Sequence, residues 1–460
     1  MINFYDSFRK EKINFIPKIN GEVSMYQCGP TVYDNAHIGN LRTYVMSDII
    51  RRVFEYEKFY VRQAMNITDI DDKTIRRSHE QNIKLSELTL KYEEIFFEDL
   101  KRLNILKPTI VMRATKYVPQ MISIISTLID KKFAYVGSDG VYFSIDKKNN
   151  YGSLAGIKKG AEQKERISND EYDKENPGDF ALWKFWSEND GENSWEAPFG
   201  KGRPGWHIEC SAMSHEALGQ PFDIHTGGID LIFPHHTNEI AQSEACYDKP
   251  LSEYWIHGGF MNVNGEKMAK SKQNFFKLSD IESAGFSPLV YRYFLFSAHY
   301  RSQMNFTFEG MVSAKNALEK IYKTLAEISK NIDTENNSSA INSDYKNKFE
   351  EAIIDDFNMP KALAIFHDLL NDKNITAEEK YFTALNFDKV FALDFKNKSF
   401  EVNKAEQNLE IPENVKKLAE ERLSARQNKD WKKADELRLE INKSGFDIID
   451  KGEGYICTII

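Results

Sequence analysis

Residues 30–40 read Pro-Thr-Val-Tyr-Asp-Asn-Ala-His-Ile-Gly-Asn and separate a strand-like stretch from a helical one. Before them, Val23 to Cys28 reads as a short buried strand, and after them a helical pattern runs from about Ile38 to Glu57. A second strand is expected from Tyr60 to Ile67. Strand, loop, helix and strand at this spacing form a βαβ unit, the building block of a parallel sheet. The sequence therefore predicts an α/β protein.

Beyond this unit the α/β pattern is interrupted once and then gives way to helices. Between about 134 and 204 the chain is charged and irregular, which indicates an insertion between two halves of one sheet. Strand and helix signals return at 222–225 and from about His235 to Tyr247. From about 310 onward the pattern is helical, and the C-terminal end reads as helices at roughly 413–428 and 431–443 followed by a β-hairpin.

Composition limits the class of protein. A chain of 460 residues is too long for one ordinary core, so two or more domains are expected. No apolar run is long enough to span a bilayer, no secretion signal opens the chain, and four cysteines do not make a disulfide framework, which together predict a cytoplasmic protein. The net charge of −9 argues against indiscriminate coating of nucleic acid, but it leaves open a specific RNA partner bound by a basic patch.

Histidine and glycine stand where the first strand gives way to the helix. Ligands bind at the carboxyl ends of strands in open parallel sheets, and helix N-termini favour phosphate. Gly39 would let a nucleotide approach the backbone closely, and the His37 imidazole could donate to a phosphate whose charge changes in the transition state. The alternative is a capped helix start with an incidental histidine.

Two lysines three residues apart form a second candidate nucleotide motif. Residues 266–272 read Glu-Lys-Met-Ala-Lys-Ser-Lys and follow a glycine-flanked segment. Lys267 and Lys270, with the hydroxyl of Ser271, would form a mobile cationic clamp suited to a triphosphate. A solvated surface is the alternative for such a lysine run.

A third group of residues has the chemistry of a zinc site. Cys28 ends the first strand, Cys210 lies in a later segment, and His235 and Glu239 are four residues apart on a predicted helix, so that both project from one face. Two thiolates, one imidazole and one carboxylate make a four-ligand zinc set. The spacing is looser than that of a CxxC pair, so a buried packing role for each cysteine stays open.

The remaining candidates keep two interpretations each. The carboxylates of Asp69, Asp71 and Asp72 resemble a metal cluster but are better explained as a helix cap, and Trp431 could stack on a base or pack in a core. Cys246 and Cys457 are interpreted as structural. Substrate contact and ordinary packing are equally open for three further histidines: His207, His236 and His257.

In their order and separation, the two nucleotide motifs resemble those of the class I aminoacyl-tRNA synthetases. Residues 37–40 match the HIGH motif, with Asn40 for the second histidine, and residues 267–271 match KMSKS, with Ala269 for the first serine. These departures predict retuned phosphate contacts. Stretches at 28–34, 66–73, 205–211 and 233–242 look like cysteinyl-tRNA synthetase, and the similarity runs over essentially the whole chain.

The resemblance implies roles for particular side chains. One zinc ion would be held by four residues, and the substrate thiolate would join the metal; these residues are Cys28, Cys210, His235 and Glu239. The amino-acid pocket would be lined by Gly29, Thr68, Trp206 and His225. The reacting phosphates and the nucleotide would be contacted by His37, Gly39, Asn40, Asp230, Lys267, Lys270 and Ser271.

The activity that this family implies is a cysteine–tRNA ligase. It activates L-cysteine with ATP and Mg²⁺ to cysteinyl-adenylate, releases pyrophosphate, and transfers cysteine to the 3′-terminal ribose of tRNA(Cys). A monomer without a membrane partner is expected. The alternatives are a cysteine ligase of small-thiol biosynthesis and a catalytically inactive, zinc-bearing RNA-binding paralogue.

The expected organisation is a Rossmann-type catalytic domain in two halves, 1–133 and 205–258, which the connective insertion 134–204 separates. A stem-contact region with the KMAKS loop is predicted at 259–310. A tRNA-binding helical bundle at 311–404 and a small anticodon-binding α/β module at 405–460 are predicted to follow.

Overall fold

A computed structural model describes residues 1–157, 178–268, 274–334, 340–407, 412–451 and 454–459. Its internal contacts divide the chain into two units, Met1–Leu318 with Ser338–Leu393 and Glu319–Asn337 with Asp394–Ile460. In the part of the chain so described, no helix has the length and apolar character needed to cross a membrane.

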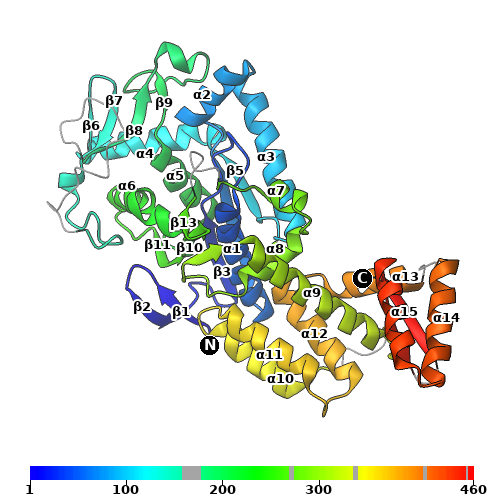
Figure 1. Ribbon diagram of the computed structural model, residues 1–460. Coiled ribbons are helices and arrows are strands. Elements are labelled where there is room, and N and C mark those ends of the chain that lie inside the picture. Colours follow the sequence, from blue (N-terminus) through cyan, green and yellow to red (C-terminus); the bar gives the residue numbers. More distant parts are fainter. Residues whose placement is uncertain (158–177, 269–273, 335–339, 408–411, 452–453, 460) are drawn as a thin grey trace. The chain divides into compact units, whose positions relative to one another are not determined.

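A five-stranded parallel sheet forms the centre of the first unit. Its spatial order is β11 (Ser252–Gly258), β10 (Phe222–Gly228), β3 (Glu22–Gln27), β4 (Tyr60–Ile67) and β5 (Ile110–Arg113). Strands from the first third of the chain, drawn in blue and cyan, thus pair with green strands from its middle (Figure 1). Strand order reverses between β3 and β10, and ligands bind at the carboxyl ends of strands at such a switch point.

Helices cover the sheet and account for the continuous burial of its strands. Helix α1 (Ile38–Tyr56) packs against β4, β10 and β11, while α5 (Trp206–Leu218) packs against β3 and β4. Helices α4 (Val118–Asp130) and α6 (Thr237–Tyr247) lie beside α5. Every residue of β10 is buried, as expected for a parallel strand that is covered on both faces.

The segment between the two halves of the sheet has its own antiparallel sheet. It consists of β6 (Ala134–Val136), β7 (Gly140–Phe143), β8 (Phe180–Phe185) and β9 (Gly202–Pro204), in that order. Helices α2 (Asp72–Gln81) and α3 (Leu85–Arg102) lie between β4 and β5 in the chain.

The rest of the first unit consists of an N-terminal hairpin and the elements that follow β11. A small sheet has the order β13 (Glu266–Lys267), β12 (Met261–Val263) and β14 (Met304–Phe306), and a hairpin of β1 (Asn3–Asp6) and β2 (Glu11–Asn14) opens the chain. The remaining helices of this unit are α7 (Leu278–Ser283), α8 (Pro288–Leu295), the start of α9 (Phe308–Ser329), α10 (Ser343–Ile354), α11 (Met359–Asn371) and α12 (Ala377–Phe391).

The second unit holds the end of α9 and the C-terminal elements. These are α13 (Phe395–Gln407), α14 (Glu413–Gln427), α15 (Trp431–Lys443) and the hairpin of β15 (Phe446–Lys451) and β16 (Gly454–Ile459). Val415, Ala419, Ile441 and Ile448 form its apolar cluster.

The predicted α/β class is confirmed, and so are the first βαβ unit, the two C-terminal helices and the final hairpin. The helix expected from about His235 begins two residues later, at Thr237. A tight turn, η5 (Ile232–His236), precedes it, and Phe233 within that turn has extended backbone angles. The helix-cap interpretation is confirmed for Asp71, whose carboxylate accepts from Lys73 N–H at the start of α2.

Candidate active site and metal centre

A pocket opens where β3 and β10 end. Its volume is about 290 Å³, and residues 28–37 form much of its wall. The rest of the wall comes from the first turns of α1, from α3, from the start of α5, from the end of β10 and the segment after it, and from the segment before Leu278; these residues are Asn40, Thr43, Tyr44, Tyr92, Phe96, Trp206, Gly228, Asp230, Leu231 and Phe275. Its position at the topological switch point is the one where α/β proteins bind ligands.

The four predicted metal ligands meet beside this pocket. Their ligand atoms all lie within 4.8 Å of one another, and all four side chains are buried. Cys28 Sγ is 4.0 Å from Cys210 Sγ and 3.7 Å from Glu239 Oε1, and His235 Nε2 is 2.9 Å from the same carboxylate oxygen. The loop after β3, helix α5, the turn η5 and helix α6 each supply one ligand, so only the folded chain assembles the set.

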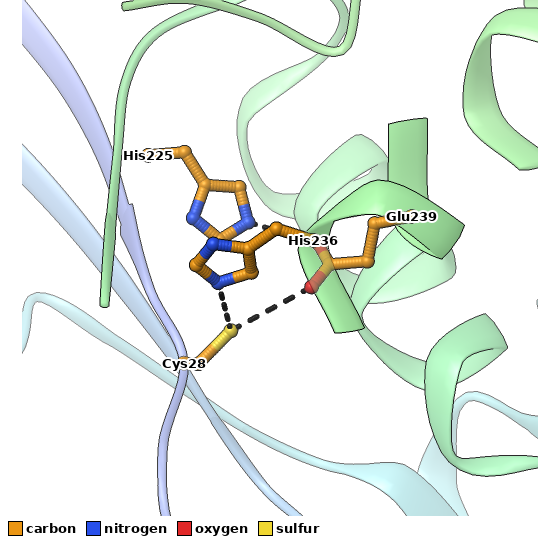
Figure 2. A group of neighbouring side chains, drawn as sticks. All are labelled: Cys28, His225, His236 and Glu239. Atoms are coloured by element: carbon orange, nitrogen blue, oxygen red, sulfur yellow. Dashed lines mark hydrogen bonds and ion pairs between the residues drawn. The ribbon is translucent and has the colours of Figure 1, made fainter. Parts of the chain in front are cut away.

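Two further histidines also contact Cys28 and Glu239. His236 Nε2 is 3.4 Å from Cys28 Sγ, and His225 Nε2 is 2.8 Å from Glu239 Oε2. Figure 2 shows these four side chains pointing toward one another, and their ligand atoms also fall within 4.8 Å. The structure therefore offers two overlapping donor sets, {Cys28, Cys210, His235, Glu239} and {Cys28, His225, His236, Glu239}.

Charges within the first set are strongly coupled. Burial raises the pKa of Glu239, but His225 and His235 outweigh it and hold that pKa well below its usual value. For His235, burial lowers the pKa, yet Glu239 and Cys210 raise it to about 10. Burial raises the pKa of Cys210 as well, but hydrogen bonds from Cys28 and His235 bring it down to about 6. Anionic donors thus gather in a buried place, an arrangement that a divalent cation stabilises.

The predicted amino-acid contacts fall into two groups. Gly29 and Trp206 line the pocket, and the Trp206 ring stacks on His235 at 4.2 Å between ring centroids. Thr68 and His225 are buried and are absent from the described residues that line it. His225 instead holds Glu239, and Thr68 donates to Glu209 Oε2 at 2.7 Å.

Thr68 belongs to a buried relay that sequence reasoning missed. Asn66 Nδ2 donates to Thr68 Oγ1 at 3.2 Å, and Asn66 Oδ1 accepts from the Gly29 N–H at 2.8 Å. The relay therefore runs from the fully buried Glu209 to the backbone beside Cys28. No local sequence pattern predicts this relay, because its members come from two strand ends and a helix.

At the start of α1, the helix-cap interpretation of the histidine is confirmed. His37 caps the helix, its Nδ1 accepting from Asn40 N–H at 3.2 Å while Asn40 Oδ1 accepts from His37 N–H at 3.4 Å. The same two side chains line the pocket, as does Asp230. A Cβ on Gly39 would lie 2.4 Å from Met268 Cε, the end of a flexible side chain, and 3.0 Å from the His37 ring.

The lysine motif is only partly described. Lys267 lies in β13 and is exposed, with its Nζ 5.8 Å from the centroid of the Phe260 ring. Ala269, Lys270 and Ser271 lie outside the described residues. The segment just beyond the motif is joined to the histidine motif, because Ile38 N–H donates to Phe276 O at 2.9 Å and Phe275 packs on His37 at 4.7 Å.

Comparison with known proteins adds a family to this geometry. Residues 14–316 match the model of the "tRNA synthetases class I (C) catalytic domain", and residues 348–393 match the DALR domain. The cysteine–tRNA ligase of Chlamydia caviae is 46% identical over 95% of this chain and 93% of its own length. That of Brachyspira hyodysenteriae is 43% identical over 98% of both chains.

Solved structures share the fold at low sequence identity. A methionyl-tRNA synthetase of Mycobacterium tuberculosis bound by methionyl-adenylate is 12% identical, with a TM-score of 0.57 over 85% of this chain and 95% of that one. The LeuRS of Agrobacterium radiobacter K84 in a ternary complex is 11% identical, with a TM-score of 0.58 over 86% of both chains.

Proposed function

This chain belongs to the cysteine–tRNA ligases of the class I aminoacyl-tRNA synthetases, and we propose that it recognises its substrate thiol through one bound zinc ion. It is a ligase that uses ATP to join L-cysteine to tRNA. The proposed zinc ligands are Cys28, Cys210, His235 and Glu239. One observation carries the proposal: these four side chains converge beside a pocket that is also lined by the nucleotide motif at the start of α1.

The two-thiolate set is the better zinc site of the two that overlap. Thiolates are soft ligands that favour zinc, and this set has two of them, whereas the set with His225 and His236 has one. We assign these two histidines to the surroundings of the ligands. His225 holds the second oxygen of Glu239, and His236 contacts Cys28. Such outer contacts orient metal ligands and tune their basicity.

Zinc gives a physical basis for choosing cysteine over serine. The two amino acids differ by one atom, and shape alone separates such near-isosteres by only ~1–3 kcal/mol. When bound, zinc prefers a thiolate and lowers the pKa of a thiol, while an alcohol stays protonated and competes weakly.

Activation would occur in the same pocket, at the other end of the amino acid. The cysteine carboxylate attacks the α-phosphorus of ATP, which gives cysteinyl-adenylate and pyrophosphate. Because His37 Nδ1 accepts the Asn40 N–H, the ring proton is on Nε2, which we assign as a donor to a phosphate oxygen. Asn40 Oδ1 is engaged by the His37 N–H, so its amide nitrogen supplies a second donor.

The remaining nucleotide contacts are proposed from position and residue type. Gly39 lies in the first turn of α1, close to the His37 ring, and Asp230 follows the end of β10 and lines the pocket where the nucleotide would bind. Lys267 and Lys270 would neutralise the leaving phosphates together with Mg²⁺, and the Ser271 hydroxyl would donate a hydrogen bond to a phosphate oxygen. The 2′-OH of the terminal tRNA ribose would then accept the cysteinyl group.

We also propose that the C-terminal part of the chain binds the tRNA, with a helical bundle at 311–404 and an anticodon-binding module at 405–460. Trp431 supports the second assignment. Its side chain is 57% exposed, which contradicts the core-packing interpretation, and Arg426 lies 5.5 Å from its ring centroid. An exposed aromatic ring with a neighbouring guanidinium suits base stacking. We further propose that the enzyme works as a monomer in the cytoplasm.

Pyrophosphate exchange with cysteine, serine and alanine tests the proposal. We expect the wild type to bind one zinc ion per chain and to exchange pyrophosphate only with cysteine. We expect Cys210→Ser to lose both the zinc and the exchange. Cys246→Ser is the matched control, because this buried cysteine lies outside both donor sets. A chain without bound zinc that still selects cysteine would contradict the metal assignment. Charging of tRNA distinguishes the ligase from an enzyme that couples cysteine to a small amine.

A further inference from the structure

We propose that His207 is a positioning residue for the metal centre, which fixes the ring of His235 by accepting a hydrogen bond from its Nδ1–H. This inference rests on the proposed zinc site. His207 is none of the ligands assigned above, and the sequence left its role open between substrate contact and packing.

The geometry of His235 leaves one nitrogen for each task. Its Nε2 faces Glu239 at 2.9 Å and is the atom that would bind the metal. Its Nδ1 lies 2.9 Å from Nδ1 of His207. A neutral imidazole that binds a metal through Nε2 carries its hydrogen on Nδ1, and this nitrogen must then donate. His207 Nδ1 is therefore the acceptor, and the hydrogen of the His207 ring is on Nε2.

His207 is itself held in place by its surroundings. Its backbone oxygen accepts from Gln242 Nε2 at 2.9 Å, and Gln242 also donates to Ser211 Oγ at 3.0 Å, so α5 and α6 are joined at this point. Its ring meets Phe180 of β8 edge to face at 5.7 Å. A hydrogen-bond acceptor can fix the orientation of a metal ligand only if the acceptor is itself held rigidly.

Through its position in α5, His207 links the placement of two metal ligands, Cys210 and His235. His207 and Cys210 are three residues apart, so they lie on neighbouring positions of one helix face. Cys210 supplies a thiolate directly, and His207 fixes the imidazole that comes from η5. Trp206 stacks on the same imidazole at 4.2 Å, so consecutive residues of α5 define both the plane and the rotation of the ligand ring.

A parallel arrangement elsewhere provides an internal control. His236 Nδ1 is 2.8 Å from His257 Nε2, so the second donor set has an orienting histidine of its own. If zinc binds the two-thiolate set, loss of the His207 ring weakens zinc binding and loss of the His257 ring does not. If zinc binds the other set, the order is reversed.

Two variants of His207 separate the hydrogen bond from the bulk of the ring. In His207→Asn the amide oxygen can take the position of Nδ1, whereas in His207→Gln the polar atoms reach the position of Nε2. Zinc affinity is measured on the full chain by competition with a chromophoric chelator, with His207→Phe and His257→Phe alongside. Melting of each metal-free variant shows whether it is folded.

We expect zinc affinity to fall about 10- to 100-fold in His207→Gln and His207→Phe and to be retained in His207→Asn and His257→Phe. The Co²⁺ derivatives of the weakened variants should keep the thiolate charge-transfer bands of two cysteines while their ligand-field bands shift. If His207→Phe fails to fold, the comparison of His207→Asn with His207→Gln still tests the role of the hydrogen bond.

Equal affinity in His207→Gln and the wild type overturns the inference, and so does an equal loss in Asn and Gln or a selective loss in His257→Phe. The zinc site itself is tested separately, by zinc binding to the wild-type chain and its loss in Cys210→Ser. If that binding stands while His207→Gln is unchanged, only the role of His207 is refuted. If the wild type binds no zinc, both proposals fall.

Discussion

Replacing Gly29 by alanine should disable amino-acid activation through one steric contact. A Cβ at this position would lie 1.7 Å from the backbone oxygen of Asn66 and 2.9 Å from Met65 Cγ. Carbon and oxygen atoms that are not bonded essentially never approach within 3.0 Å, so the two chain segments would have to separate.

The surrounding backbone makes that separation costly. Thr68 N–H donates to Pro30 O at 3.0 Å, and Val32 N–H donates to Thr68 O at 3.2 Å, so the ends of β3 and β4 are paired just beyond the contact. The Gly29 N–H also donates to Asn66 Oδ1 at 2.8 Å. Moving the loop away from β4 therefore shifts Cys28 and the pocket wall together.

The expected size follows from the displacement. A shift of roughly 1 Å in groups that position a substrate costs about 100-fold in rate, so we expect Gly29→Ala to lower kcat/KM for cysteine in pyrophosphate exchange by about that factor. Overpacking should also lower the free energy of unfolding by about 1–3 kcal/mol.

A tightly packed glycine outside the pocket wall is the control. A Cβ on Gly310 in α9 would lie 2.9 Å from Phe294 Cε2, and neither residue lines the pocket. Gly310→Ala should change stability while leaving exchange unaffected. A folded Gly29→Ala enzyme with exchange close to that of the wild type would refute the reasoning, because the loop would then move without consequence for the pocket.

Three further outcomes are expected. Asp48→Asn should lower the free energy of unfolding by ~3–5 kcal/mol in urea, because it leaves the fully buried Arg292 without its carboxylate, which is 2.6 Å away. Burial raises the pKa of Asp48, but its arginine partners outweigh burial and lower that pKa. The stabilisation is therefore present at neutral pH, and wild-type melts should show its loss as the pH falls below about 4. An Asp48→Asn variant that is equally sensitive to acid would contradict this reasoning. Thr68→Val should cost ~1–3 kcal/mol, since the buried Glu209 then loses its hydrogen-bond donor, and Thr68→Ser should restore the stability in the same denaturation assay. Trp431→Ala should weaken tRNA charging by the ~1–3 kcal/mol of one stacked base while pyrophosphate exchange stays unchanged; a loss of both would point to unfolding instead.

The local sequence pattern was enough to predict the helices and strands that depend only on residues close together in the chain. The helix after residue 37 was expected to end at about Glu57 and ends at Tyr56, and the strand from Tyr60 to Ile67 has the predicted bounds. Helical and extended periodicities are properties of short windows, and caps and turns are made by adjacent residues. The resemblance to cysteinyl-tRNA synthetase likewise singled out residues 28, 210, 235 and 239 as a ligand set before any distance was known.

The tertiary structure decided what depends on segments far apart in the chain. The residue types and the family resemblance predicted one donor set around Cys28, but the fold brings His225 and His236 to the same sulfur and carboxylate and so creates a second. Thr68 was expected to line the pocket, but in the fold it donates a hydrogen bond to Glu209, 141 residues later in the chain. Such contacts depend on how β3, β10, α5 and α6 pack together, and because packing in a dense core is collective, no short window contains the information that positions them.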